Sequence, residues 1–263
     1  MHEESTQQYD AFSPDYHWLY SDDGLRGNMA IEENDDVLRE AGSKARILDC
    51  SCGIGVFAIA LARLGYEVSG SDGSEGMIEQ AALAARNAGL EIPLICCTWA
   101  DLPARFTDRF DVVFCLGNSI GHTGGHAGGH AGGHTCNGEE MVRSLEGMRA
   151  VLRNGGKLVI QSRNWEHLRK EKTRFTYFPW RQRGGQRCLP IYVWTFPERI
   201  EDAHTIEVVL VFDRDGKASI RSYPIVYHPF RAETLIERLR LAGFREIRNG
   251  FSESKAEYRV IAW

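Results

Sequence analysis

The sequence predicts an α/β protein with a doubly wound, seven-stranded, mostly parallel sheet and a strand-rich insertion after the fifth strand. Three observations support this prediction. Apolar runs typical of strands alternate with helical patterns between residues 45 and 162, which indicates parallel strands joined by right-handed crossovers. A glycine-rich turn follows the first apolar run, where a strand would pass into a helix. Between residues 164 and 230 apolar and polar residues alternate, as in antiparallel strands.

The elements of the sheet follow in chain order. Strands of the first part are expected at residues 45–50, 66–71, 92–97, 110–116 and 156–162. Helices between them are expected at residues 56–64, 75–88 and 138–153. We expect Asn154-Gly-Gly156 to end the last of these helices, because glycine is common just past a helix C-terminus. The C-terminal part is expected to add a helix at 231–242 and strands at 244–250 and 256–263.

The insertion contains three alternating runs, at 191–196, 205–212 and 218–223. Asp213-Arg-Asp-Gly216 separates the last two runs and is typical of a hairpin turn. We expect a separate antiparallel layer over the edge of the main sheet at which ligands bind. The alternative is a long hairpin that continues the main sheet.

Composition is that of an ordinary soluble protein, with a net charge of -5, 43% hydrophobic and 25% charged residues. No basic tract favours nucleic acid, and no apolar run approaches the roughly 20 residues of a membrane helix. The N-terminus lacks the apolar core of a signal peptide. Most of the seven cysteines lie in or beside apolar strands, which indicates buried, reduced thiols and a cytoplasmic protein.

The turn Asp49-Cys-Ser-Cys-Gly-Ile-Gly55 is the strongest functional signal in the chain. Its glycines let the backbone approach a ligand closely, and the N–H groups of the following helix would point at that ligand. Asp72 follows the next strand. An acidic residue about 20 positions after a glycine-rich turn suits the two hydroxyls of a ribose. The sequence therefore predicts an adenosine-containing cofactor.

Several strand ends resemble the class I S-adenosylmethionine-dependent methyltransferases. Leu48–Gly55 is similar to the first motif of that family and Ser71–Met77 to its second. Asp111–Leu116 and Leu152–Leu158 are similar to its fourth and fifth strand signatures. The resemblance spans roughly residues 45–162 and the C-terminal unit. It implies a Rossmann-like methyltransferase fold, a transferase activity and S-adenosyl-L-methionine as the methyl donor.

The resemblance also implies a set of donor-binding residues. Asp72 would bind both ribose hydroxyls, Asp49 would orient the turn or the donor's amino group, and Asp101 would contact the adenine amino group. The residues expected at the donor are Tyr20, Arg26, Asp49, Cys50, Gly53, Gly55, Asp72, Gly73, Met77, Thr98, Trp99, Ala100, Asp101, Cys115 and Leu116. Of these, Tyr20 and Arg26 would close over the donor from an N-terminal helical lid formed by residues 1–40.

A closer resemblance is to the glycine and sarcosine N-methyltransferase branch of the family. Cys115–His122 and Ser162–His167 are similar to its segments after strands four and five, which implies that Asn118 and Arg163 hold a small carboxylate substrate. Residues 41–163 and 231–263 would then form the donor-binding domain. The segment 164–230 would be the antiparallel insertion on the substrate side.

Aromatic residues of the insertion are further candidates for the acceptor. Tyr177, Trp180 and Tyr192 suit a sugar ring or an ammonium group, although alternating aromatic residues also form the core of such an insertion. His122 and His167 are candidates for a general base.

The glycine-rich segment 121–134 is expected to be a flexible loop with histidines at a spacing of four. The four histidines are His122, His126, His130 and His134. Such a set could bind a divalent metal, functional or adventitious.

Three functions are compatible with the sequence. The first is methyl transfer to a small polar acceptor, best the amino group of glycine, sarcosine or a related amino acid. The second is a sugar O-methyltransferase with a histidine base, with or without a divalent metal. The third is a non-catalytic protein that binds a cofactor or metal. Each binds a small molecule rather than nucleic acid or membrane, and the sequence leaves open whether the chain forms a homo-oligomer.

Overall fold

A computed structural model describes residues 3–123, 138–200 and 202–263 of the 263-residue chain. Its main sheet has seven strands in the order β11-β12-β5-β4-β1-β2-β3. The strands are β1 (Arg46–Asp49), β2 (Glu67–Asp72), β3 (Leu94–Cys96), β4 (Phe110–Cys115), β5 (Leu152–Arg163), β11 (Ile247–Asn249) and β12 (Glu257–Ala262). The first five pair in parallel, whereas β12 is antiparallel to both β5 and β11. This confirms the predicted seven-stranded, mostly parallel sheet.

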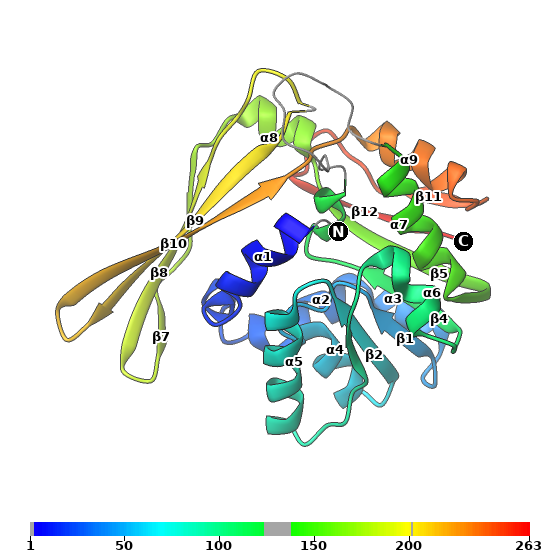
Figure 1. The fold of residues 1–263 in the computed structure, drawn as a ribbon, viewed down its shortest axis with the longest axis horizontal. Helices are drawn as coiled ribbons and strands as arrows, with labels where there is room; N and C mark the ends of the chain where they lie inside the picture. The colour runs from blue at the N-terminus through cyan, green and yellow to red at the C-terminus, as the bar shows by residue number, and fades with distance from the viewer. Residues whose placement is uncertain (1–2, 124–137, 201) are drawn as a thin grey trace.

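Helices cover both faces of this sheet (Figure 1). They include α2 (Asn28–Glu33), α3 (Asp35–Ala41), α4 (Val56–Arg63), α5 (Glu75–Asn87), α6 (Leu102–Arg105), α7 (Gly138–Ala150) and α9 (Ala232–Leu241). Alternate strand residues point to opposite faces, so neighbours in one strand join different cores. In β4, Val113 packs with α7 and α9, while Phe114 packs with α3 and α4. The sheet is therefore doubly wound.

The helix expected at 138–153 is shorter than predicted. It ends at Ala150, and Asn154-Gly-Gly156 lies within β5 instead of capping the helix. The pairing of β4 with β5 jumps between Phe110 and Val112, so β5 carries extra residues there. Gly155 has a φ of +75°, and a Cβ on Gly156 would lie 2.9 Å from the Phe110 carbonyl oxygen. The two glycines therefore allow the irregular pairing of β4 with β5 at this point.

The insertion forms a second, antiparallel sheet, so the alternative of a hairpin that continues the main sheet is wrong. Its strands are β6 (Phe175–Tyr177), β7 (Arg181–Arg183), β8 (Gln186–Trp194), β9 (His204–Arg214) and β10 (Lys217–Tyr227), preceded by α8 (Trp165–Glu171). The hairpin predicted between β9 and β10 is confirmed. Its turn residues Asp215 and Gly216 have φ values of +52° and +76°, as a two-residue hairpin of this hand requires.

The N-terminal segment connects the two sheets. It contains α1 (Glu3–Phe12) and the short 3₁₀ helices η1 (Tyr16–Leu19) and η2 (Gly24–Arg26). Helix α1 lies between the second sheet and α5 (Figure 1). Asp15 accepts hydrogen bonds from Arg221 and Tyr223 of β10, while Asp10 accepts them from Ser74 Oγ and the Gly76 N–H of the main domain. This segment is therefore anchored both to the second sheet and to the main domain.

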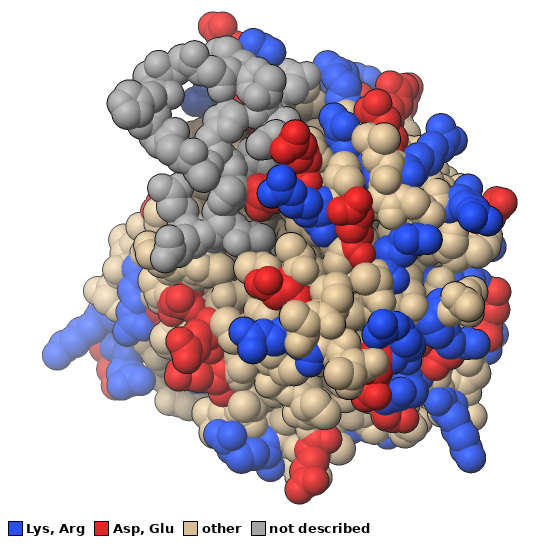
Figure 2. All heavy atoms as spheres, turned by 45° about the vertical axis from the view of Figure 1, so that its right-hand side comes forward, with Lys and Arg blue, Asp and Glu red and all other residues tan. Residues whose placement is uncertain are grey.

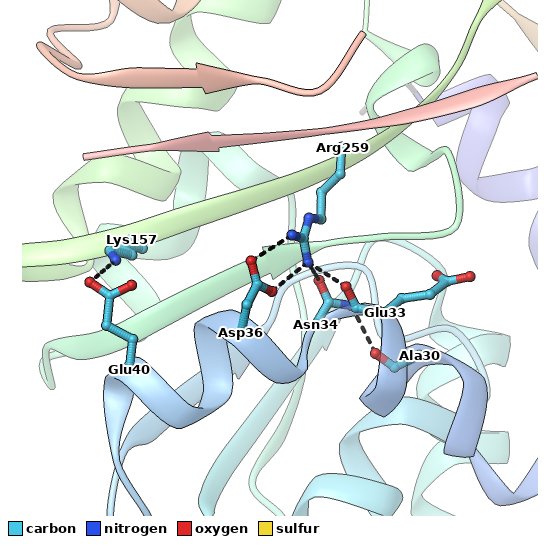
Figure 3. A network of polar contacts seen from close by, with 7 residues as sticks. All are labelled: Ala30, Glu33, Asn34, Asp36, Glu40, Lys157 and Arg259. Atoms are coloured by element: carbon cyan, nitrogen blue, oxygen red, sulfur yellow. Dashed lines mark hydrogen bonds and ion pairs between the residues drawn. The ribbon is translucent and has the colours of Figure 1, made fainter. Parts of the chain in front are cut away.

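Arg259 ties the N-terminal helices α2 and α3 to β12 (Figure 3). Its guanidinium donates to both carboxylate oxygens of Asp36 at 2.9 and 2.7 Å, to Asn34 Oδ1 at 3.3 Å, and to the Glu33 carbonyl oxygen. Burial acts to raise the pKa of the Asp36 carboxyl. These bonds and the charge of Arg259 outweigh burial and hold that pKa below its usual value. The Arg259 side chain therefore supplies hydrogen bonds to three polar groups where α2 ends and α3 begins.

Replacing Arg259 by methionine should lower the free energy of unfolding by about 1–2 kcal/mol, because a bidentate pair and two bonds to the helix junction are lost. The matched control is Arg39→Met. Arg39 also pairs with an aspartate, Asp35, but its side chain is 80% exposed, so about 0.5 kcal/mol or less is expected. Urea denaturation measures both. Equal losses for the two variants would contradict the role assigned to Arg259.

The outer surface has a mixed charge. On the face drawn in Figure 2, Lys and Arg side chains are interspersed with Asp and Glu, without a large area of one sign. Within the described ranges, none of the helices is long and apolar enough to cross a membrane. The six cysteines of the described part, Cys50, Cys52, Cys96, Cys97, Cys115 and Cys188, are all free thiols.

Candidate active site

The glycine-rich turn lies between β1 and α4, at the carboxyl edge of the sheet. Gly53 and Gly55 have φ values of +52° and +83°, a conformation that side chains with a Cβ rarely adopt. A Cβ on Gly55 would also lie 3.1 Å from the Cβ of Ala81. A Cβ on Gly53 would meet only Tyr16 Cε1, at 3.9 Å. The turn is therefore shaped by its glycines, and Gly53 borders open space.

Asp72 at the end of β2 links this turn to the start of α5. Its Oδ2 accepts the Gly53 N–H at 2.9 Å and its Oδ1 accepts the Ser74 N–H at 3.0 Å. Burial raises the pKa of Asp72, while these backbone bonds act in the opposite direction. A carboxylate has about four lone-pair sites, so each oxygen can still accept a hydroxyl proton. This arrangement suits a ribose diol.

Asp49 at the end of β1 is a buried carboxyl with weak support from the protein. Only 2% of its surface is exposed, and its Oδ1 accepts a long hydrogen bond of 3.4 Å from the Ser51 N–H. Burial raises its pKa to about 7, and the nearby charge of Asp72 adds to this effect. A buried carboxyl in this state gains from a cationic partner.

A small cavity opens in front of the glycine-rich turn. Its lining residues are Tyr9, Tyr16, Ser51, Gly53, Asp72, Met77, Trp99, Gly117, Ser119 and His122. It encloses about 30 Å³, room for a water molecule but not for a nucleoside. Tyr9 and Tyr16 come from the N-terminal segment and cover it from outside. A ligand as large as a nucleoside would therefore fit only if the walls of this cavity moved apart.

A second cavity of about 300 Å³ lies beside the first, between the sheet edge and the inner face of the second sheet. The two share Tyr9, Tyr16 and Gly117. The other lining residues are Phe12, Leu19, Tyr20, Asn118, Arg163, Phe178, Tyr192, Ile206, Val208, Ile225, Tyr227 and Glu257. Its volume suits a small organic ligand.

Two buried polar groups of this second cavity lack a partner among the described residues. They are the Nη1 of Arg163, which ends β5, and the Oδ1 of Asn118, which follows β4. The guanidinium carbon of Arg163 lies 4.7 Å from the ring centroid of Tyr227. Asn118 is 7% exposed, and its Nδ2 donates to Glu257 Oε1 at 2.8 Å. Unpaired buried polar atoms cost free energy, so this pair indicates a ligand with an anionic group and an N–H or O–H donor.

His122 is held as a neutral imidazole in the wall of the small cavity. Its Nδ1 lies 3.0 Å from the Val226 carbonyl oxygen and its Nε2 lies 2.9 Å from the Tyr9 hydroxyl. A carbonyl only accepts, so Nδ1 carries the proton and Nε2 accepts from Tyr9. Burial, with a smaller contribution from the charge of Arg163, lowers the pKa of His122 to about 3. At neutral pH this ring is a weak base.

The two cavities bring together many of the residues predicted from the sequence. Gly53, Asp72, Met77, Trp99 and His122 line the small cavity, and Tyr20, Asn118, Arg163 and Tyr192 line the large one. The Trp99 indole donates to the Cys50 carbonyl oxygen at 2.7 Å, which fixes its ring in the small cavity. Leu116 is bonded to Ser51 Oγ through its N–H and its carbonyl. Thr98 Oγ1 donates to exposed Asp101, beyond the end of β3.

Other predicted residues line neither cavity. Arg26 is exposed and pairs with Asp23, and the ring nitrogen of His167 contacts the Glu253 carbonyl oxygen. Tyr177 is 79% exposed. In the register of β6 with β8 it is Thr176 that lies opposite Tyr192, so Tyr177 belongs to the other face. The ring of Trp180 is partly exposed and packs on the Arg187 guanidinium.

Sequence reasoning missed several residues of the cavities. Tyr9 and Tyr16 were detectable, because Tyr9, Phe12, Tyr16 and Tyr20 recur at helical spacing and three of them carry hydroxyls. Ser51 lies inside the glycine-rich motif. Tyr227 and Glu257 carry no local signal, since only the fold brings them to Asn118.

A divalent metal lacks support at this site. Among the described residues no group of three or more His, Cys, Asp or Glu side chains is arranged to hold a metal ion. Both ring nitrogens of His122 are already in contact with Tyr9 and Val226. The other predicted metal ligands, His126, His130 and His134, lie outside the described residues, as does most of the loop predicted at 121–134.

Comparisons with known proteins agree with this geometry. Residues 47–156 match a family model described as a methyltransferase domain. A glycine/sarcosine N-methyltransferase of Aphanothece halophytica is 29% identical over 144 residues, which are 54% of this chain and 49% of the relative. The chain thus spans about half the length of the curated relatives it matches.

Solved structures are similar over nearly the whole chain. The CcbJ methyltransferase of Streptomyces caelestis superposes with a TM-score of 0.73 at 19% identity, over 99% of this chain and 98% of that one. A SAM-bound amino pentose methyltransferase of Micromonospora echinaspora, CalS10, superposes with a TM-score of 0.67 at 17% identity, over 96% and 95%.

The domain match and the fold together define an α/β methyltransferase domain built around the glycine-rich turn. The chain thus has a methyltransferase domain and the fold of class I S-adenosylmethionine-dependent methyltransferases, which confirms the resemblance seen in its sequence.

Proposed function

We propose that this protein transfers a methyl group from S-adenosyl-L-methionine to the amino group of an acceptor that also carries a carboxylate, such as glycine, sarcosine or a related amino acid. The observation that carries the proposal is the pair of unpartnered buried atoms, Arg163 Nη1 and Asn118 Oδ1, in one cavity. A guanidinium is suited to a carboxylate, and an amide oxygen accepts an amine N–H. An amino acid supplies both groups.

The small cavity and the strand ends beside it suit the donor. In the cavity, Asp72 offers oxygens to the ribose and the turn at Gly53 allows close approach. Asp49, which lies at the end of β1 next to this turn and lines neither cavity, offers a buried carboxyl to the ammonium group of the donor. When bound, the donor supplies a methyl group already activated by a sulfonium charge. The protein then has to align the acceptor nitrogen and exclude water. Tyr9 and Tyr16 stand where the two cavities meet, and as part of the proposed lid of residues 1–40 they would open for the donor and close over it.

The state of His122 favours an amine over a hydroxyl acceptor. A hydroxyl has to lose its proton to a base, whereas an amine attacks through its lone pair once it is neutral. With a pKa of about 3 and both nitrogens engaged, His122 is poorly suited to take up a hydroxyl proton. The sugar O-methyltransferase is therefore the less well supported alternative. His167, the other base candidate, lines neither cavity.

The comparisons also support an amine. One relative is named a glycine/sarcosine N-methyltransferase, and one structural neighbour is an amino pentose methyltransferase. An amino sugar would satisfy Asn118 and the aromatic walls of the cavity. It would leave Arg163 without an anion.

A methyl-transfer assay with four acceptors tests the proposal. Glycine or sarcosine should be methylated, and an amino sugar without a carboxylate should react with a kcat/KM roughly 100-fold lower, because the charge-assisted bonds to Arg163 are missing. A sugar without an amine should not react. A chelator should leave the rates unchanged. Methylation of the neutral sugar alone would overturn the proposal, and donor binding without transfer to any acceptor would favour the non-catalytic alternative.

A further inference from the structure

Three hydrogen bonds and the peptide bond between Gly117 and Asn118 join four residues into a ring, and three of these residues line the large cavity. The Gly117 N–H donates to Gln161 Oε1 at 3.1 Å, and Gln161 Nε2 donates to Glu257 Oε2 at 3.1 Å. Asn118 Nδ2 donates to Glu257 Oε1 at 2.8 Å, and Asn118 is the chain neighbour of Gly117. Glu257 lies directly opposite Arg163 in the pairing of β12 with β5.

The ring fixes the orientation of both amide side chains. A backbone N–H only donates, so it requires the oxygen of Gln161 and turns the Gln161 NH₂ toward Glu257. A carboxylate only accepts, so it also requires the NH₂ of Asn118. The Asn118 Oδ1 is then left facing away from Glu257, buried and without a partner among the described residues. Asn118 has a φ of +65°, which asparagine tolerates better than most residues, so its backbone is confined as well.

We infer that Glu257 is a specificity-determining positioning residue, which makes the cavity select an amine by holding the carbonyl oxygen of Asn118 toward the acceptor. The inference rests on the proposed function. If the Asn118 amide turned over, its NH₂ would face the acceptor, where it would favour a hydroxyl or ether oxygen and oppose an amine N–H. Glu257 acts through Asn118 and need not contact the acceptor itself.

Glu257→Gln is the sharpest variant, because the ring leaves glutamine one good orientation. Gly117 still requires the oxygen of Gln161, so the Gln161 NH₂ requires the oxygen of the new side chain. The NH₂ of residue 257 then faces Asn118 and forces its amide to turn over. We expect the KM for glycine or sarcosine to rise roughly 30-fold, with kcat and the donor Kd changed by about threefold or less.

Two comparisons separate this role from a loss of charge or of structure. Glu33→Gln is the control for charge, since Glu33 and Glu257 line one groove outside the large cavity, and burial together with the charge of Glu257 raises the pKa of Glu33. It should change KM by about twofold or less. In an Asn118→Ala background, Glu257→Gln should raise the KM by a further factor of about two or less, because the Asn118 amide that the substitution would reorient is absent. A full 30-fold effect in that background would overturn the inference.

A measurement without turnover keeps the inference apart from the proposed function. In ¹⁵N-labelled protein the side-chain NH₂ signals of Asn118 are identified by their loss in Asn118→Ala. Their protons should exchange with solvent at least roughly tenfold more slowly in the wild type than in Glu257→Ala, where the acceptor is missing. Equal exchange rates would overturn the inference even if amines are methylated. Slow exchange without methylation of any amine would leave the assigned orientation standing and reject the proposed function.

Discussion

Replacing Arg163 by alanine is expected to raise the KM for a carboxylate-bearing amine about 100-fold, while the Kd for the methyl donor changes by about threefold or less. The physical reason is the location of the guanidinium. Its Nη1 is buried without a partner in the described part of the chain, next to the rings of Tyr227 and Trp194. Removing one member of a buried charge pair costs about 3–5 kcal/mol, and water entering the vacated space should offset part of this cost.

Arg163→Lys tests whether geometry matters beyond charge. A lysine keeps the positive charge but cannot present two parallel N–H groups to a carboxylate. We therefore expect the KM of Arg163→Lys to be about tenfold above that of the wild type. Arg187→Ala is the matched control, because Arg187 also lies in a strand and packs on an aromatic ring, Trp180, but outside the cavities. Steady-state kinetics on glycine, sarcosine and an amino sugar measure these effects. A wild-type KM in Arg163→Ala would remove Arg163 from the acceptor site.

The sequence predicts the donor half of this site far better than the acceptor half. The residues proposed to bind the donor, Asp49, Gly53 and Asp72, follow two consecutive strands, and parallel strands bring their carboxyl ends to one edge whatever the rest of the chain does. Their positions therefore follow from strand order alone.

The acceptor half depends on contacts that no local pattern encodes. Glu257 and Asn118 are 139 residues apart and meet because β12 pairs with β5. Tyr177 was expected at the acceptor but lines neither cavity, whereas its neighbour Phe178 lines the large one, because a shift of one residue in a strand decides which face a side chain occupies. Gly155 and Gly156 resemble a helix cap in sequence, yet tertiary pairing with β4 uses them in a strand.

Donor binding is expected to depend on pH through Asp49. Its carboxyl has a pKa of about 7 in the folded protein, mainly because it is buried, compared with an ordinary value of 3.8. If the ionised carboxylate pairs with the ammonium group of S-adenosylmethionine, binding requires that the proton leave. The fraction ionised falls about tenfold between pH 8 and pH 6, so the donor affinity should fall by about the same factor. Isothermal titration at pH 6, 7 and 8 measures it.

Asp49→Asn supplies the control, and folding stability gives an independent check. Between pH 3.8 and 7 the folded protein holds a proton that the unfolded chain releases, so this carboxyl makes the protein less stable as pH rises through that range. An asparagine cannot ionise. The variant should therefore match the wild type near pH 4 and exceed its free energy of unfolding by on the order of 2–4 kcal/mol at pH 8. The donor affinity of Asp49→Asn should be lower than that of the wild type at pH 8. It should also lack the tenfold fall between pH 8 and pH 6 that is assigned to Asp49. If the variant is more stable at pH 8 but binds the donor as tightly as the wild type does, Asp49 has a structural role in the turn and does not bind the donor.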